Sequence, residues 1–212
     1  TNLISVKFTN TIRELPSYMF QNCEKLQTVQ FPNNIKTLGS YIFRGCKLLC
    51  DVTIPDTVTT IGGNAFANCT SLHAIEIPKG VTEIASGTFY GCETLSDVSI
   101  PESVKTIGSS AFTSCTSITR IKLPMQMSKI DSGTFSQCSS LRKIALPEGL
   151  ASIEGSTFWK CVSLQEIYIP ATVKTVGGSA FYACKSLNKV YFGGSEDLWN
   201  QVVIVDDYDH GN

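Results

Sequence analysis

Apolar residues recur along this chain with a fixed step of 23 residues. One column of Leu and Ile consists of Leu26, Leu49, Leu72, Leu95, Ile118, Leu141, Leu164 and Leu187. Three positions later a column of Val and Ile begins, and a third apolar column follows after one more intervening residue. The resulting I-x-I segment alternates as a strand does when one of its faces is buried. A proline follows each segment and ends the strand, because proline cannot donate to a ladder, and the proline column stops at Gly193.

The rest of the repeat carries a turn signature. Phe is followed three residues later by Cys at Phe20/Cys23, Phe43/Cys46, Phe66/Cys69, Phe89/Cys92, Phe112/Cys115, Phe135/Cys138, Phe158/Cys161 and Phe181/Cys184. The A-F-x-x-C stretch is too short for a full helix and predicts a single helical or 3₁₀ turn. Leu3, Val6 and Phe8 fit the same apolar columns. The chain therefore opens inside a partial repeat, and we expect a mature or trimmed fragment.

A unit of this length cannot bury its own apolar positions, but stacked units can, since equivalent residues then lie on top of one another. The sequence therefore predicts one solenoid across residues 1–212. We expect about eight repeats over roughly 3–192, a continuous parallel sheet with one strand per repeat, and a C-terminal cap and tail over 193–212. A parallel β-helix with three long sheets per turn is the main alternative.

The repeat L-x-x-I-x-I-P-x-x-V-x-x-I-G-x-x-A-F-x-x-C resembles the BspA-like leucine-rich repeat over nearly the whole chain. The ending, from Tyr191 through Gly193 and Gly194 to Trp199, is similar to the family's usual terminus. The resemblance implies a leucine-rich-repeat solenoid, a right-handed β/α superhelix with a parallel sheet. It also implies a surface or secreted protein of gut or oral bacteria, or of mucosal protists, that acts in adhesion and has no catalytic residues. Met125-Gln126-Met127 departs from the pattern in the turn after the fifth strand.

Composition narrows the function further. Hydrophobic residues make up 42% of the chain and charged residues 17%, which suits a continuous core. The net charge of −1 disfavours nucleic-acid binding. No apolar run is long enough to insert into a membrane. His73 and His210 are the only histidines, and no catalytic or phosphate-binding motif is present. We expect a monomeric, non-catalytic module without cofactor or metal.

Nine cysteines could suggest a disulfide framework, but eight of them lie on one column. We predict that these are small buried thiols, with bridges between adjacent rungs as the alternative. A second alternative is a zinc site, because stacking brings Cys46, Cys50, Cys69 and His73 into one neighbourhood. The objection is direction: the column of Cys46 and Cys69 should face the core, whereas that of Cys50 and His73 begins the strand.

The C-terminal segment predicts a cap. Ser195 can N-cap a short helix with Glu196 and Asp197 in its first turn, and Trp199 can then cover the last rung. The acidic stretch that follows, residues 206–209, lacks the spacing of a calcium loop and reads as a solvated terminus.

Residues that flank the buried strand positions must face outward. Along the stack they change in kind: Asp51, Glu76 and Asp97 come first, then Arg120, Lys122, Lys143 and the adjacent Arg142, and finally Tyr168 and Tyr191. Such charges can simply serve solubility. They can also form a bipolar strip that orients a partner, namely a host or bacterial surface protein. Two other functions stay open: glycan or mucin binding, with the tyrosines stacking on sugar rings, and an architectural spacer.

Overall fold

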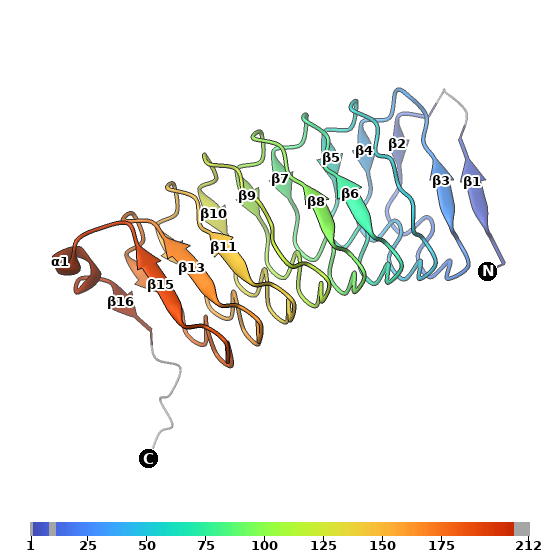
Figure 1. The fold of residues 1–212 in the computed structure, drawn as a ribbon. Coiled ribbons are helices and arrows are strands. Elements are labelled where there is room, and N and C mark those ends of the chain that lie inside the picture. Colours follow the sequence, from blue (N-terminus) through green and yellow to red (C-terminus); the bar gives the residue numbers. More distant parts are fainter. Residues whose placement is uncertain (1, 9–11, 206–212) are drawn as a thin grey trace, which may run out of the picture.

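The computed structural model describes residues 2–8 and 12–205, which form one elongated stack of rungs (Figure 1). The predicted solvated tail, residues 206–209, and His210 lie outside the described residues. Each rung has three sides: a strand, a second short strand and a turn. We call the three stacked sides the sheet row, the second row and the turn row.

The sheet row is built from the I-x-I segments, and its strands run parallel. Its strands are β1 (Ser5–Lys7), β3 (Thr28–Gln30), β6 (Ala74–Glu76), β8 (Asp97–Ser99), β11 (Lys143–Ala145), β13 (Glu166–Ile169) and β15 (Lys189–Phe192). Every pairing joins residues 23 positions apart, as in Val6 with Val29 and Ile144 with Ile167. The solenoid and the register predicted from the sequence are confirmed.

The prediction of one strand per repeat is wrong, because a second row of parallel strands lies behind the first (Figure 1). These strands are β2 (Glu14–Leu15), β4 (Thr37–Leu38), β5 (Thr60–Ile61), β7 (Glu83–Ile84), β9 (Thr106–Ile107), β10 (Lys129–Ile130), β12 (Ser152–Ile153), β14 (Thr175–Val176) and β16 (Val203–Ile204). From β2 to β14 the second apolar pair of each repeat causes this. Its last residue points into the core, and the extended backbone there pairs with the same segment of the next rung. In contrast, β16 comes from the C-terminal segment, pairs with β14 at a step of 28 residues, and leaves Ile204 exposed.

The A-F-x-x-C stretch forms tight turns rather than the predicted helical or 3₁₀ turn. In each rung the residue directly before the column cysteine has a positive φ, for example 58° at Asn68 and 69° at Gly91. The Cys69 N–H donates to the Phe66 carbonyl at 3.1 Å, which closes a four-residue turn. A positive φ at the third position suits a type II turn and is incompatible with a right-handed helix.

The turn row is bonded without interruption from the rung of Tyr18 to the rung of Tyr182. Each step is joined by three backbone hydrogen bonds, as in Phe43 N–H to the Ala65 carbonyl at 2.8 Å and Phe66 N–H to the Thr88 carbonyl at 2.9 Å. The phenylalanine rings inside it stack along the axis with centroids 5.4–5.7 Å apart. This side therefore holds the rungs in register.

The two strand rows, in contrast, are interrupted, so the prediction of a continuous parallel sheet is wrong. Within the described residues, the sheet row is unpaired between residues 51–53 and β6, and again between β8 and residues 120–122. The second row is unpaired between β5 and β7 and between β10 and β12. At the first of these places both rows open between the same two rungs. The uninterrupted turn row keeps the rungs together there, so the strands can separate without breaking the stack.

The C-terminal end is capped in part. Ser195 precedes α1 (Glu196–Trp199) and its hydroxyl accepts from the Leu198 N–H at 3.3 Å, so the predicted N-cap is confirmed. The Trp199 ring packs edge-on against Phe192 at 5.2 Å and is half-buried. Val190 on the same last rung stays 50% exposed. Trp199 thus covers one corner of the end rather than all of it.

Candidate functional site

The outward side chains of the sheet row form a continuous surface, which we call the sheet face. It includes residues 51–53 and 120–122, which occupy equivalent positions in rungs without an assigned strand. The nine residues predicted for partner binding are all exposed: Asp51, Glu76, Asp97, Arg120, Lys122, Arg142, Lys143, Tyr168 and Tyr191. The residues between them in the strands, such as Ile75 and Ile144, are buried. The period-2 alternation therefore identified the outward positions correctly.

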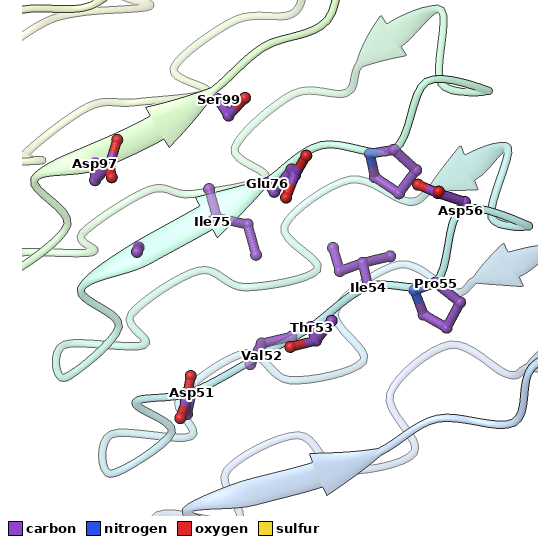
Figure 2. Close-up of a pocket in the computed structure, with 12 residues that line it drawn as sticks. Asp51, Val52, Thr53, Ile54, Pro55, Asp56, Ile75, Glu76, Asp97 and Ser99 are labelled. Carbon is purple, nitrogen blue, oxygen red and sulfur yellow. The ribbon is translucent and has the colours of Figure 1, made fainter.

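One hollow on this face is acidic. A depression of about 640 Å³ lies over the place where both strand rows open, and its charged lining consists of Asp51, Asp56, Glu76 and Asp97. A larger depression of about 720 Å³ lies beside it over β1 and β3 and includes Lys7 as well as Asp51. The apolar walls of the acidic hollow come from Ile54, Pro55, Ile75 and other residues drawn in Figure 2. Asp51, Glu76 and Asp97 come from three successive rungs, and none of the four carboxylates forms an ion pair with a described residue. The hollow thus combines apolar surface with unpaired negative charge.

Basic residues of the sheet face lie on the rungs that follow the acidic hollow. Arg120 and Lys122 line a second depression of about 520 Å³, which also contains Asp97 at its edge. Neither cation has a carboxylate partner among residues 2–8 and 12–205. Arg142 is exposed immediately before β11, at the corner of the rung. These three residues carry the unpaired positive charge on the rungs that follow the acidic hollow, and Lys7 in β1 is a further exposed cation without an ion pair to a described residue.

Lys143 does not belong with them, contrary to the sequence prediction of a four-residue basic cluster. Its ammonium pairs with the Glu166 carboxylate at 2.9 Å, and Lys189 reaches the same carboxylate from the next rung at 3.1 Å. Hydrogen bonds from these two lysines lower the pKa of Glu166 below its ordinary range. The signal for this triad was present in the sequence, because Glu166 lies 23 residues after Lys143 and 23 before Lys189.

The aromatic end lies beyond the triad. Tyr168 pairs in register with Tyr191, and both line a small hollow of about 250 Å³ above Ala145. A Cβ at Gly193 would lie 2.6 Å from the Tyr168 hydroxyl oxygen, so a larger residue at this position would require the Tyr168 side chain to move.

The cysteine ladder is structural. All nine cysteines are free. Seven thiols donate to the phenylalanine carbonyl of the preceding rung at 3.0–3.2 Å, as Cys92 does to Phe66. Burial raises the pKa of Cys92 to about 12, so its thiol stays protonated and unreactive.

The zinc set considered from the sequence is split between core and surface. Cys46 and Cys69 are buried and point to backbone carbonyls, whereas Cys50 and His73 are exposed. Among the residues whose placement is described, no group of three His, Cys, Asp or Glu side chains is arranged to hold a metal ion. The same part of the chain holds no helix with the length and apolar character needed to cross a membrane.

Stacked rungs of constant length, with a parallel sheet row closed by a proline, define a leucine-rich-repeat solenoid. Six copies of the repeat described as BspA type Leucine rich repeat region match residues 1–117 and 59–188. The chain therefore belongs to this family, as its repeat had indicated. A comparison with curated proteins finds no match.

Solved structures of bacterial proteins share the fold. A leucine-rich repeat protein from Bacteroides ovatus is 26% identical with a TM-score of 0.72; the alignment covers 96% of this chain and 62% of that protein. The T. pallidum protein TpLRR is 25% identical with a TM-score of 0.60, over 89% of this chain and 79% of the other. A leucine rich cell surface protein from Faecalibacterium prausnitzii is 24% identical with a TM-score of 0.51, over 95% and 82%. This chain thus spans less than two thirds of the Bacteroides protein.

Proposed function

We propose that this chain is a non-catalytic binding module that recognises a protein partner through its sheet face, outside the cell or at its surface. The observation that carries this is the charge of that face. Asp51, Glu76, Asp97, Arg120 and Lys122 are exposed on neighbouring rungs and have no ion-pair partner among the described residues. The face is also hollowed along its length. Unsatisfied charge beside apolar hollows favours a partner of complementary charge.

The reactive side chains of the described residues lie away from the hollows of the sheet face, which supports a binding role. Seven of the eight column thiols are buried and Cys184 is partly buried, while the exposed Cys50 and His73 line none of the hollows described on the face. The extracellular or surface location is supported by the BspA-type family and by the similarity to the leucine rich cell surface protein of Faecalibacterium prausnitzii.

The test begins with peptides selected from a random phage-display library on the wild-type chain. Their association rates are then measured with a variant carrying Arg120→Glu and Lys122→Glu, which avoids the ion-paired Lys143. A matched control carries Lys36→Glu and Lys174→Glu, exposed positions next to the second row. Reversal on the sheet face should slow association of acidic peptides about ten-fold or more at low salt and flatten its salt dependence. Equal slowing in the control would show that only net charge matters and would reject the proposal.

A glycan-binding role is the second candidate, and the specific observation for it is the aromatic end. Tyr168 and Tyr191 are 37% and 50% exposed beside the Glu166 carboxylate, a combination suited to stacking on a sugar ring and accepting hydrogen bonds from its hydroxyls. A glycan array probed with wild type and with Tyr168→Ala tests it. Binding of a defined saccharide that the variant loses would favour this candidate.

A further inference from the structure

We infer that the sheet face docks an extended polypeptide segment whose charges follow the opposite order: basic residues over the acidic rungs and acidic residues over the basic rungs. This inference rests on the proposed function and adds to it the chemistry and the orientation of the partner. It concerns the sheet face from Asp51 to Arg142.

The acidic hollow suits the side chain of arginine or lysine. Asp51 and Asp97 lie on the same column two rungs apart, which the usual strand spacing makes about 9–10 Å, and Glu76 lies on the rung between them. The wall of Ile54, Pro55 and other apolar residues can cover the methylene stem, while the carboxylates receive the cationic head (Figure 2). At about 640 Å³ the hollow has room for more than a single side chain.

The backbone below the hollow adds polar groups that a partner can use. Residues 51–53 and β6 do not pair with each other, and the same two rungs are also unpaired in the second row. Amide and carbonyl groups that would bond across this gap in an intact ladder lack that partner here. This is the one step in the described stack where both strand rows open together.

The basic rungs receive the other end of the segment. Arg120 and Lys122 follow Asp97 by one rung, and Arg142 lies at the corner of the rung after them. Arg120 lies one rung after Asp97 on the same column, so the sign of the face changes over about 5 Å, which an extended chain crosses in roughly two residues. A segment laid down in the reverse direction would place like charges over both halves. Like-charge juxtaposition is a strong penalty, so the face should accept one orientation only.

The experiment uses a synthetic peptide of about twelve residues, long enough at roughly 3.3 Å per residue to cover both halves of the face. Its arginines are grouped at one end and its glutamates at the other. A control peptide has the same composition with the charges alternating. The grouped peptide should bind at least about ten-fold more tightly than the alternating one at low salt. A spin label on the arginine end should broaden the amide signals of residues 51–53 and 74–76, and a label on the glutamate end those of residues 120–122.

Matched variants complete the test. The triple change Asp51→Asn, Glu76→Gln and Asp97→Asn should remove the advantage of the grouped peptide. Glu83→Gln, Glu93→Gln and Glu148→Gln alter the net charge equally at exposed positions off the sheet face and should leave it intact. Equal affinity for the two peptides, equal effects of the two triples, or a stronger effect of the arginine-end label on residues 120–122 than on residues 51–53 would overturn the inference. The proposed function would survive that result if the phage-selected peptides still depended on Arg120 and Lys122, and would fail with it if they did not.

Discussion

Replacing Phe112 with alanine tests the physical basis of the stack. Its side chain is fully buried between Phe89 and Phe135, with ring centroids at 5.4 and 5.7 Å. Removing a buried phenylalanine costs about 3–5 kcal/mol in lost burial and residual cavity. Each stacked pair contributes roughly 0.5–1.5 kcal/mol beyond its buried area. Because two pairs are lost, we expect a destabilisation of about 5 kcal/mol, at the upper end of the range.

The assay is urea unfolding followed by both circular dichroism and tryptophan fluorescence, since repeat arrays can depart from two-state behaviour. Phe181→Ala is the matched control. Phe181 is only partly buried and has a single ring neighbour, Phe158 at 5.5 Å. The Phe181→Ala variant should lose about 2 kcal/mol of unfolding free energy, because the side chain it removes is only partly buried. Equal losses at Phe112 and Phe181, or a loss at Phe112 below about 2 kcal/mol, would refute the reasoning that the ring ladder carries the core.

Three further predictions concern the cap, the thiols and the lysine–glutamate triad. Trp199→Ala should cost about 2 kcal/mol, less than a fully buried tryptophan because it covers one corner of the last rung; an unchanged urea midpoint would remove it from the cap. In the native chain a thiol reagent near neutral pH should modify Cys50 rapidly and the buried column thiols only on unfolding; fast labelling of Cys92 would contradict its burial. Glu166→Gln should lower the melting temperature at neutral pH. Because the folded pKa of Glu166 lies below its ordinary 4.5, this difference should shrink as the pH falls below that value, and a difference independent of pH would exclude the ion pairs.

Much of the fold followed from the sequence because the repeat has no insertions. The constant step fixed which residues stack, so the register of Val6 on Val29 and the burial of Ile144 could be predicted without coordinates. The second strand row was missed because two extended residues, such as Thr60 and Ile61, give too short a signal to distinguish a strand from a turn. The turn type was missed because its positive φ falls on residues as different as Asn68, Gly91 and Lys160.

The positions of the candidate-site residues could be predicted from the sequence, but the ion pairs among their side chains could not. Alternation placed Lys143 and Glu166 on the sheet face, but only the coordinates show that their side chains meet and that Lys189 joins them. Likewise, Asp51 and Glu76 were recognised as outward, while the hollow between them is visible only in the structure. A repeat pattern describes what all rungs share, and the binding surface arises where individual rungs differ.

We propose that the sheet face, and no other side of the stack, is the binding surface. The most direct measurement is the map of amide chemical-shift changes in the ¹⁵N-labelled chain when phage-selected peptides are added. We predict that the changes concentrate on residues 51–53, 74–76, 97–99 and 120–122. Changes centred instead on the turn row around Trp159 and Tyr182, whose rings also stack at the surface, would contradict the account.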